Sequence, residues 1–496
     1  AGLTTLDADT AKALAEFKGS SFLLAGLTAL DADSAKALTA YKGQVLNLNG
    51  LTKLDADTAR ALADSKSSLL ALEGLRSLDV ATAKALAKST AWQPQLPNVA
   101  TLDAETAAAL ATTGRDWLVL NGLKSLDAAT AKALAAYKGD VLKLDGLTSL
   151  DADTAKALAE STCNTLYLHG LITLDADTAR ALAKFPGNAL SLDGLTTLDA
   201  DTARELANCK CTLLLLNGLT SLDADTATAL ADSTCNTLFL HGLTTLDAAT
   251  ARALADCKCN SLYLNGLTTL DADTAQALAG SKAWQAQLPG LTSLDAATAT
   301  ALAGYKGVAL ELPGLTSLDA AAAKALAEFE GQSLSLAGVT TLDVASATAL
   351  GAFQGESLCL SGLTTLEVDT AQALAAFPGN SLDLSGLTAL DIDCAKAFAE
   401  HSGAVGISAD MVHELMSKHP FDRDTTLAYA ALAGGVLQSV TAFESPDSVA
   451  IAKALAKRQG PLALPNLKRI SPKTLTALIE KKDVEIPLFE TLELIP

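Results

Sequence analysis

Cysteine is the side chain with the most distinctive chemistry in this sequence, and six of its eight cysteines lie between residues 163 and 259. Thiols clustered in this way can form disulfides, hold a metal ion, or fill space as free thiols. Their spacing is regular, because positions 211, 235 and 259 follow one another at intervals of 24 residues. The six candidates are Cys163, Cys209, Cys211, Cys235, Cys257 and Cys259.

A second group combines aromatic rings with histidine, aspartate and asparagine over nearly the same segment. It consists of Tyr167, His169, Asp193, Asn217, Phe239, His241, Tyr263 and Asn265. Aromatic side chains that anchor a partner, beside polar groups that orient it, are typical of a protein-recognition surface. The alternative is drift in a recently duplicated block, since residues 161–169 and 233–241 are near copies. The sequence leaves both interpretations open.

The elements that position these side chains follow from a 24-residue repeat, which runs seventeen times through residues 2–409 without an insertion. Residues 194–217 (GLTTLDADTARELANCKCTLLLLN) are representative, and positions 1 to 24 are counted from the glycine. Leu214 and Leu216 alternate as in a short strand with one buried face. Aspartate at position 6 precedes apolar residues in helical spacing, which predicts a helix capped by that carboxylate. Glycine at position 18, as in Gly187, predicts a helix end with positive φ.

Repeats of this kind contact only their neighbours, and stacking pairs their strands in parallel about 4.8 Å apart. The pattern L-x-L-x-G-L-T-x-L-D-x-x-T-A-x-A-L-A resembles the leucine-rich repeat, in a bacterial type, over residues 2–409. The resemblance implies an α/β leucine-rich-repeat solenoid with a curved parallel sheet on its concave side and short helices on its convex side. It also implies protein recognition without catalytic residues. The sequence departs from the usual pattern in one respect. The Asn or Cys that normally follows the strand and hydrogen-bonds to the backbone is replaced by Gly-Leu-Thr.

Two further parts are predicted beyond the regular array. Residues 410–439 lose the register and contain both methionines, which indicates a helical insertion. Residues 440–496 resume the pattern as degenerate leucine-rich repeats. The longest uncharged run, residues 425–443, contains two adjacent glycines, and we interpret it as a helix followed by a strand rather than a membrane span.

Stacking assigns the two groups of side chains to columns. The cysteines occupy positions 16 and 18, in the loop that returns from helix to strand, where neighbouring repeats lie within disulfide range. We predict bonds between repeats, for instance Cys235 with Cys257 or Cys211 with Cys235, in an oxidising compartment. Free thiols that fill the loops remain the alternative. The aromatic and polar group occupies positions 22 and 24 on the concave face of repeats 7–11, so these bonds would stiffen a binding patch.

Metal and enzyme chemistry are disfavoured by the spacing of the candidate ligands. Sulfurs spread over three repeats do not converge on one zinc ion, and two repeats separate Asp193 from His241. His413-Glu414 is followed by His419, which is too distant for a zinc-protease helix. The recurring D-A-D lacks the third carboxylate of a calcium loop, although calcium bridging of stacked aspartate rows stays open. We therefore predict no metal site, no cofactor and no enzymatic activity.

The charge balance bears on the class of partner. A net charge of −20 and a pI near 4.6 predict no binding to nucleic acid or to an anionic membrane, and no basic patch is visible along the sequence. Trp92 and Trp284, in return loops eight repeats apart, either dock a partner or fill a local gap.

The predicted function is a non-enzymatic scaffold for protein–protein interaction, extracellular or at the cell surface, with its concave binding surface at repeats 7–11. The alternative is a structural subunit that self-associates end to end into an extracellular filament, sheath or surface layer, because neither end of the array carries a polar cap. The chain opens on Ala1 without a signal sequence, so we expect a processed form or a part of a longer protein.

Overall fold

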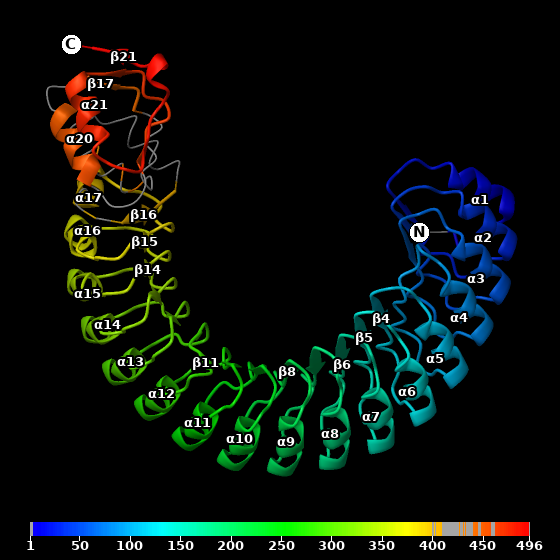
Figure 1. Cartoon of the computed structure of the whole chain (residues 1–496). Helices are drawn as coiled ribbons and strands as arrows, with labels where there is room; N and C mark the ends of the chain where they lie inside the picture. Colours follow the sequence, from blue (N-terminus) through cyan, green and yellow to red (C-terminus); the bar gives the residue numbers. More distant parts are fainter. Residues whose placement is uncertain are drawn as a thin grey trace. The chain divides into compact units, whose positions relative to one another are not determined.

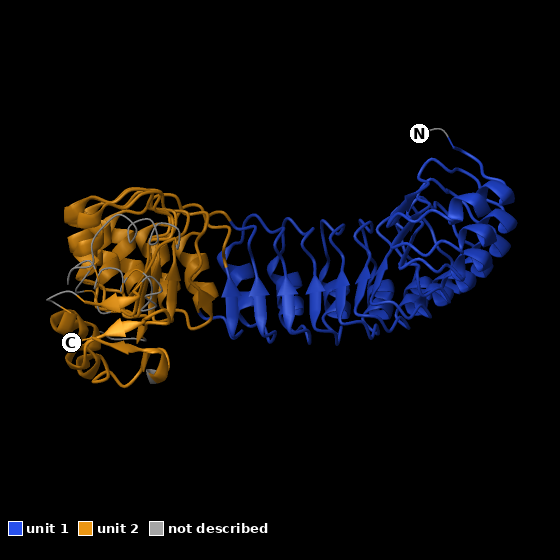
Figure 2. Ribbon diagram, turned by 90° about the horizontal axis from the view of Figure 1, so that it is seen from above, with its two compact units in different colours: residues 1–243, 256–263 blue, residues 244–255, 264–496 orange. Residues whose placement is uncertain are grey.

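The computed structural model describes residues 3–398, 401, 403–408, 426, 430, 432, 440–444, 448–457 and 462–495. The chain divides into two compact units, which are described separately (Figure 2). Unit 1 comprises Ala1–Leu243 and Asp256–Tyr263, and unit 2 comprises Thr244–Ala255 and Leu264–Pro496. In the part of the chain that the structure describes, no helix is long and apolar enough to cross a membrane.

Unit 1 is a stack of repeats with helices along one side and strands along the other (Figure 1). Its strands pair in parallel and in register, so Leu214 lies opposite Leu190 and Leu238 of the neighbouring repeats. The helices are α1 (Ala8–Ala15), α2 (Ala32–Leu38), α3 (Ala56–Ala63), α4 (Val80–Leu86), α5 (Ala104–Ala111), α6 (Ala128–Leu134), α7 (Ala152–Leu158), α8 (Ala176–Leu182), α9 (Ala200–Ala207) and α10 (Ala224–Ala231). The strands are β1 (Ser21–Leu23), β2 (Val45–Asn47), β3 (Leu69–Ala71), β4 (Trp117–Val119), β5 (Val141–Lys143), β6 (Thr165–Tyr167), β7 (Ala189–Ser191), β8 (Leu213–Leu215), β9 (Thr237–Phe239) and β10 (Ser261–Tyr263).

The strands of unit 1 fall into two parallel groups, β1 to β3 and β4 to β10, on either side of repeat 4. Repeat 4 contributes only isolated bridges, which join Leu70 to Trp92 and Gln95 to Val119. Pro94 lies between them, and proline has no backbone N–H to donate to a sheet, so the regular pairing is interrupted there.

Unit 2 continues the alternation of helix and strand. Its helices are α11 (Ala248–Ala255), α12 (Ala272–Ala279), α13 (Ala296–Ala303), α14 (Ala320–Ala327), α15 (Val344–Leu350), α16 (Val368–Ala375), α17 (Ile392–Ala397), α20 (Ser448–Lys457), α21 (Pro472–Leu478) and the 3-10 helix η2 (Phe489–Thr491). Its strands are β11 (Trp284–Gln285), β12 (Ala309–Glu311), β13 (Ser333–Ser335), β14 (Ser357–Cys359), β15 (Ser381–Asp383), β16 (Ala404–Gly406), β17 (Ala442–Phe443), β18 (Leu462–Ala463), β19 (Arg469–Ile470), β20 (Val484–Glu485) and β21 (Glu493–Leu494). Strands β12 to β16 form one parallel sheet in sequence order.

The C-terminal part of unit 2 is less regular. The predicted helical insertion at residues 410–439 lies outside the described residues, apart from Thr426, Ala430 and Leu432. After it, β17, β19 and β21 form one parallel sheet and β18 and β20 form another, with α20 packed against α21. The division of the chain at residues 410 and 440 stays a prediction.

Columns of leucine and alanine fill the core. In repeat 9, Leu195, Ala203, Leu206, Leu214 and Leu216 are fully buried. The leucines that alternate along β8 and the apolar residues in helical spacing on α9 therefore meet in one layer, as the sequence predicts. Each layer is closed by the layers of the neighbouring repeats.

Positions 16 and 18 share one space in the return loop. Phe185 at position 16 is fully buried, and a Cβ added to Gly187 at position 18 would lie 2.3 Å from Cζ of that ring. Gly187 does not have a φ in the left-handed region, so the prediction of a positive φ there is wrong. The glycine is required because the ring occupies the place of a side chain. Repeat 3 fills the same space with Ser65 and Ser67, whose hydroxyl oxygens are 2.9 Å apart.

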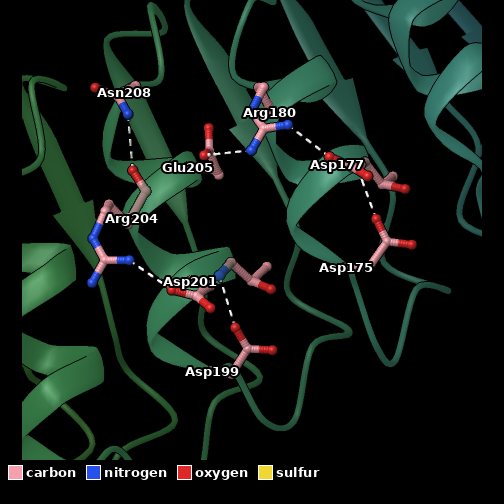
Figure 3. Close-up of polar contacts among 10 residues, drawn as sticks. Asp175, Asp177, Arg180, Asp199, Asp201, Arg204, Glu205 and Asn208 are labelled. Carbon is pink, nitrogen blue, oxygen red and sulfur yellow. Dashed lines mark hydrogen bonds and ion pairs between the residues drawn. The ribbon is translucent and has the colours of Figure 1, made fainter.

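Aspartate at position 6 caps the helices, as predicted. The Thr202 backbone N–H donates to Oδ1 of Asp199 at 2.8 Å (Figure 3). At the preceding helix, the backbone N–H of Thr178 holds the pKa of Asp175 below its ordinary value. The stabilisation by Asp175 is therefore complete above the ordinary carboxyl pKa and is lost as the pH falls through the lowered pKa.

Ion pairs lie on the exposed side of the helices. Arg180 contacts Asp177 one turn earlier at 2.6 Å and Glu205 of the next repeat at 2.8 Å (Figure 3). Exposed pairs contribute between about 0 and 1 kcal/mol each, so they add less to stability than the buried leucine layers do.

One helix lacks the cap and provides a test of it. Glu367 replaces the aspartate before α16, and its side chain makes no capping hydrogen bond with any described residue. We expect Glu367→Asp to raise the free energy of unfolding by about 0.5–1 kcal/mol in urea titrations, because the shorter side chain reaches the N–H groups. The matched control is Asp343→Glu, since Asp343 accepts from the Ser346 backbone N–H at 2.7 Å. That variant should lose a similar amount, and changes of the same sign in both would contradict the explanation.

Candidate functional site

The predicted recognition residues lie on the strand side of the array, at the positions expected. Those up to Tyr263 lie on strands β6 to β10 of unit 1 or two residues after the end of such a strand, and Asn265 belongs to unit 2. In unit 2, the side-chain amide of Asn265 donates to Oε1 of Gln287 at 3.2 Å. The aromatic and polar members in unit 1 fall into two clusters and a connecting hydrogen-bonded row.

The first cluster is a cation held between two rings. Nζ of Lys143 on β5 lies 5.1 Å from the ring centroid of Trp117 on β4 and 4.8 Å from that of Tyr167 on β6. Trp117 is 52% exposed. Cation–π contacts at such exposed sites contribute about 0.5–1 kcal/mol each, so the three side chains hold one another in place. The sequence-based prediction missed Trp117 and Lys143, although Trp117 is a tryptophan at an exposed strand position.

The second cluster contains two stacked rings and a histidine. Phe239 and Tyr263 stack with centroids 4.9 Å apart and planes 8° apart. His241 lies edge-on to both rings, and its Nε2 has no hydrogen-bond partner within the described ranges. Burial lowers the pKa of His241, and the charge of Asp193 offsets this only in part, so the ring is neutral at pH 7.

His169 is the centre of a polar network between the two clusters. Its Nε2 is 2.7 Å from Oγ of Ser191, and its Nδ1 is 3.5 Å from Oδ1 of Asp145. The order Asp, His, Ser is that of a hydrolytic triad. However, Ser191 is fully buried, and its hydroxyl donates to Oδ2 of Asp193 at 3.1 Å. A substrate carbonyl has no access to this hydroxyl, so the network is a rigid polar support rather than a nucleophilic site.

Side chains at position 24 form a ladder of hydrogen bonds with the backbone of the next repeat. Oδ1 of Asp145 accepts from the backbone N–H of His169 at 3.2 Å. Asp193 accepts in the same way from the N–H of Asn217 at 2.9 Å, and Asn217 from that of His241 at 3.1 Å. Side chains after the strand thus hydrogen-bond to the backbone of the next repeat, although Gly-Leu-Thr replaces the usual Asn or Cys. Asp193 and Asn217 join successive repeats, so they support the surface more than they offer groups to a partner.

The cysteines pair within loops rather than between repeats. Disulfides join Cys209 to Cys211 and Cys257 to Cys259, with Cα atoms 5.4 Å apart in each. The predicted bonds from Cys235 to Cys257 and from Cys211 to Cys235 are therefore wrong. The physical reason is that the side chains at positions 16 and 18 point toward each other across their own loop, in the space that Phe185 fills in repeat 8.

The other two candidate cysteines are free thiols. Sγ of Cys163 lies 3.2 Å from Oγ of Ser161, and Sγ of Cys235 lies 3.0 Å from Oγ of Ser233. Burial raises the pKa of both thiols, so they are protonated at pH 7 and unreactive. They fill loop space, which is the alternative that the sequence left open.

The disulfide pairing predicts how many free thiols the protein contains. Titration of the denatured protein with a thiol reagent, without reductant, should find four reactive thiols, because Cys163, Cys235, Cys359 and Cys394 are free. Peptide mapping should then place each disulfide within a single Cys-Lys-Cys sequence. Eight reactive thiols, or a peptide that links two repeats, would contradict this assignment.

Two other features bear on candidate sites. Trp92 and Trp284 are fully buried, so both rings fill their loops and leave no aromatic face for a partner. Among the described residues, no group of three or more His, Cys, Asp or Glu side chains could hold a metal ion.

The comparisons with known proteins concern the fold. No protein-family model matches the sequence, and no curated protein does. Solved structures with a similar fold include a TLR13–ssRNA13 complex (16% identity, TM-score 0.40), the Toll–Spatzle complex of Drosophila (12%, 0.43) and the mouse RP105/MD-1 complex (15%, 0.40). The matches cover 91%, 76% and 89% of this chain, and 60%, 54% and 81% of those chains. This chain thus spans less than two thirds of the length of the first two.

The class of the fold is defined by the elements of the chain itself. Short parallel strands with Leu-x-Leu lie on one side, short capped helices lie on the other, and both recur every 24 residues. The protein is an α/β leucine-rich-repeat solenoid, as the sequence predicted.

Proposed function

We propose that this protein is a non-enzymatic scaffold for protein–protein interaction. Its binding surface is the concave strand face of unit 1 from β4 to β10. The observation that carries the proposal is the row of aromatic and cationic side chains on that face: Trp117, Lys143, Tyr167, Phe239 and Tyr263. Aromatic residues are enriched among the few interface residues that supply most of the binding energy, and a basic residue beside them adds a charged contact.

The polar residues of the same face support the aromatic anchors. His169 is hydrogen-bonded to Ser191, and Asp193 and Asn217 are fixed by the ladder. Side chains that are already held in one arrangement lose little freedom when a partner binds. The predicted patch at repeats 7–11 is therefore retained and extended to repeats 5 and 6.

The proposal includes a location and a kind of partner. Two disulfides favour an oxidising compartment, and hence the extracellular space or the cell surface. The net charge of −20 favours a protein partner over nucleic acid at this face. We also propose that the repeat is of the bacterial type, which its sequence pattern resembles.

The test measures a partner captured by the unaltered protein from native cell-envelope extract. Tyr167→Ala, Phe239→Ala and Tyr263→Ala should each weaken its binding by about tenfold or more in surface plasmon resonance. Ile172→Ala is the control, since Ile172 is 58% exposed on unit 1 but lies at position 3, outside the strand. Binding that survives all three aromatic substitutions would reject the proposed surface.

Sedimentation at several protein concentrations addresses the alternative function. We expect a species whose mass does not depend on concentration. Growth into long particles as the concentration rises would instead favour the end-to-end filament, sheath or surface layer.

A further inference from the structure

A hollow of about 580 Å³ lies at the return loops of the first three repeats in unit 1. Lys18, Lys42 and Lys66 line it together with Glu16 and Phe17. All three lysines are exposed. Within a chain of net charge −20, this is a local group of three cations around one cavity.

The three lysines meet because they occupy the same place in successive repeats. Each lies at position 17, three residues before a strand that pairs in register with the next. Ser21 on β1 lies opposite Val45 on β2, and Val45 lies opposite Leu69 on β3. Neighbouring strands are about 4.8 Å apart, so stacking brings together charges that are separated by 24 residues in the sequence.

Two of the lysines at position 17 of other repeats have carboxylate partners. Nζ of Lys258 lies 2.7 Å from Oδ1 of Asp232, and Nζ of Lys306 lies 2.7 Å from Oε2 of Glu330. By contrast, Lys18, Lys42 and Lys66 make no ion pair with any residue that the structure describes. The next residue in this column is another lysine for both Lys18 and Lys42, so positive charges adjoin in these three repeats.

We propose that this hollow binds a multivalent oxyanion, a short chain of phosphate or sulfate groups. Three ammonium groups in a row match negative charges that recur along a chain, and an anion placed among them relieves their mutual repulsion. Lysine binds phosphate and sulfate as a point charge with three donors, which suits an open site without fixed geometry. The site is separate from the strand face of unit 1 and does not depend on the function proposed for that face.

The test uses the whole chain and two defined probes, inorganic tripolyphosphate and sucrose octasulfate, in isothermal titration calorimetry. The triple variant Lys18→Gln/Lys42→Gln/Lys66→Gln should bind at least about tenfold more weakly, since each exposed ion pair contributes a factor of a few. Binding to the unaltered protein should weaken as sodium chloride rises, because salt screens exposed charges. Tighter binding of one probe identifies the anionic group as phosphate or as sulfate.

The matched control is Lys84→Gln/Lys132→Gln/Lys156→Gln, which removes the same charge from exposed positions on α4, α6 and α7. This variant should keep the affinity of the unaltered protein. Equal losses in the two variants would show that net charge, not the hollow, attracts the anion and would overturn the proposal. If neither probe binds the unaltered protein at millimolar concentration, the proposal is overturned as well.

Discussion

Replacing Phe353 by alanine should lower the free energy of unfolding by about 3–5 kcal/mol. Phe353 occupies position 16 of its return loop in unit 2 and is fully buried. Its ring stacks on Phe329 and Phe377, with centroids 6.2 and 6.0 Å apart. Truncation removes a buried ring, opens a cavity and interrupts a column of aromatic rings that runs through four neighbouring loops and ends at His401.

Urea unfolding followed by circular dichroism measures this loss. The control is Val344→Ala in the same repeat, since Val344 is 46% exposed on α15 and its truncation should change stability by less than about 0.5 kcal/mol. If Phe353→Ala were as mild as Val344→Ala, the stacked column would not be a source of stability.

Replacing Gly194 by alanine should destabilise the protein by about 2–3 kcal/mol. Gly194 is position 1 of its repeat, where the backbone turns after the strand. A Cβ placed there would lie 1.9 Å from the carbonyl oxygen of His169 and 2.7 Å from that of Leu171. Both atoms are backbone at the junction of repeats 7 and 8 and cannot rotate away, so the adjacent turns of the chain must separate to admit a methyl group.

Thermal unfolding of Gly194→Ala beside Gly114→Ala provides the comparison. A Cβ at Gly114 would meet no described atom within 4 Å. That variant should be neutral or more stable by up to about 1 kcal/mol, because alanine restricts the unfolded chain. Equal melting temperatures for the two variants would refute the close approach of successive repeats at position 1.

The elements of the fold were predictable from short-range patterns. Alternating Leu214 and Leu216 predicted a strand, and Asp199 before an apolar helical spacing predicted a capped helix. Both predictions are confirmed. What the patterns did not predict is which side chains of successive repeats contact one another. The ladder from Asp193 to Asn217 and the Lys18–Lys42 column depend on the directions of side chains in the stacked repeats, which the spacing of residues along the sequence does not determine.

The candidate site was predicted in part. Tyr167, Phe239 and Tyr263 lie on the strand face, as expected from their positions. Trp117 was not predicted because it lies at position 20 of repeat 5, whereas the candidate residues lie at positions 22 and 24 of repeats 7–11. The cysteine pairing was wrong because strand spacing was used to judge distance between loops. The direction of a side chain within its own loop decides which sulfur it reaches. The structure shows this direction in repeat 8, where the ring of Phe185 at position 16 lies against Gly187 at position 18.

Both disulfides begin and end inside a single loop, and this has a consequence for how the array can change in length. When a stretch of whole repeats is copied or lost, each disulfide-bonded cysteine keeps its partner, because neither disulfide crosses a boundary between repeats. If disulfides joined successive repeats instead, the same change would leave an unpaired cysteine at each new junction. The gene is thus free to expand or contract in steps of 72 nucleotides while the oxidised protein stays correctly joined.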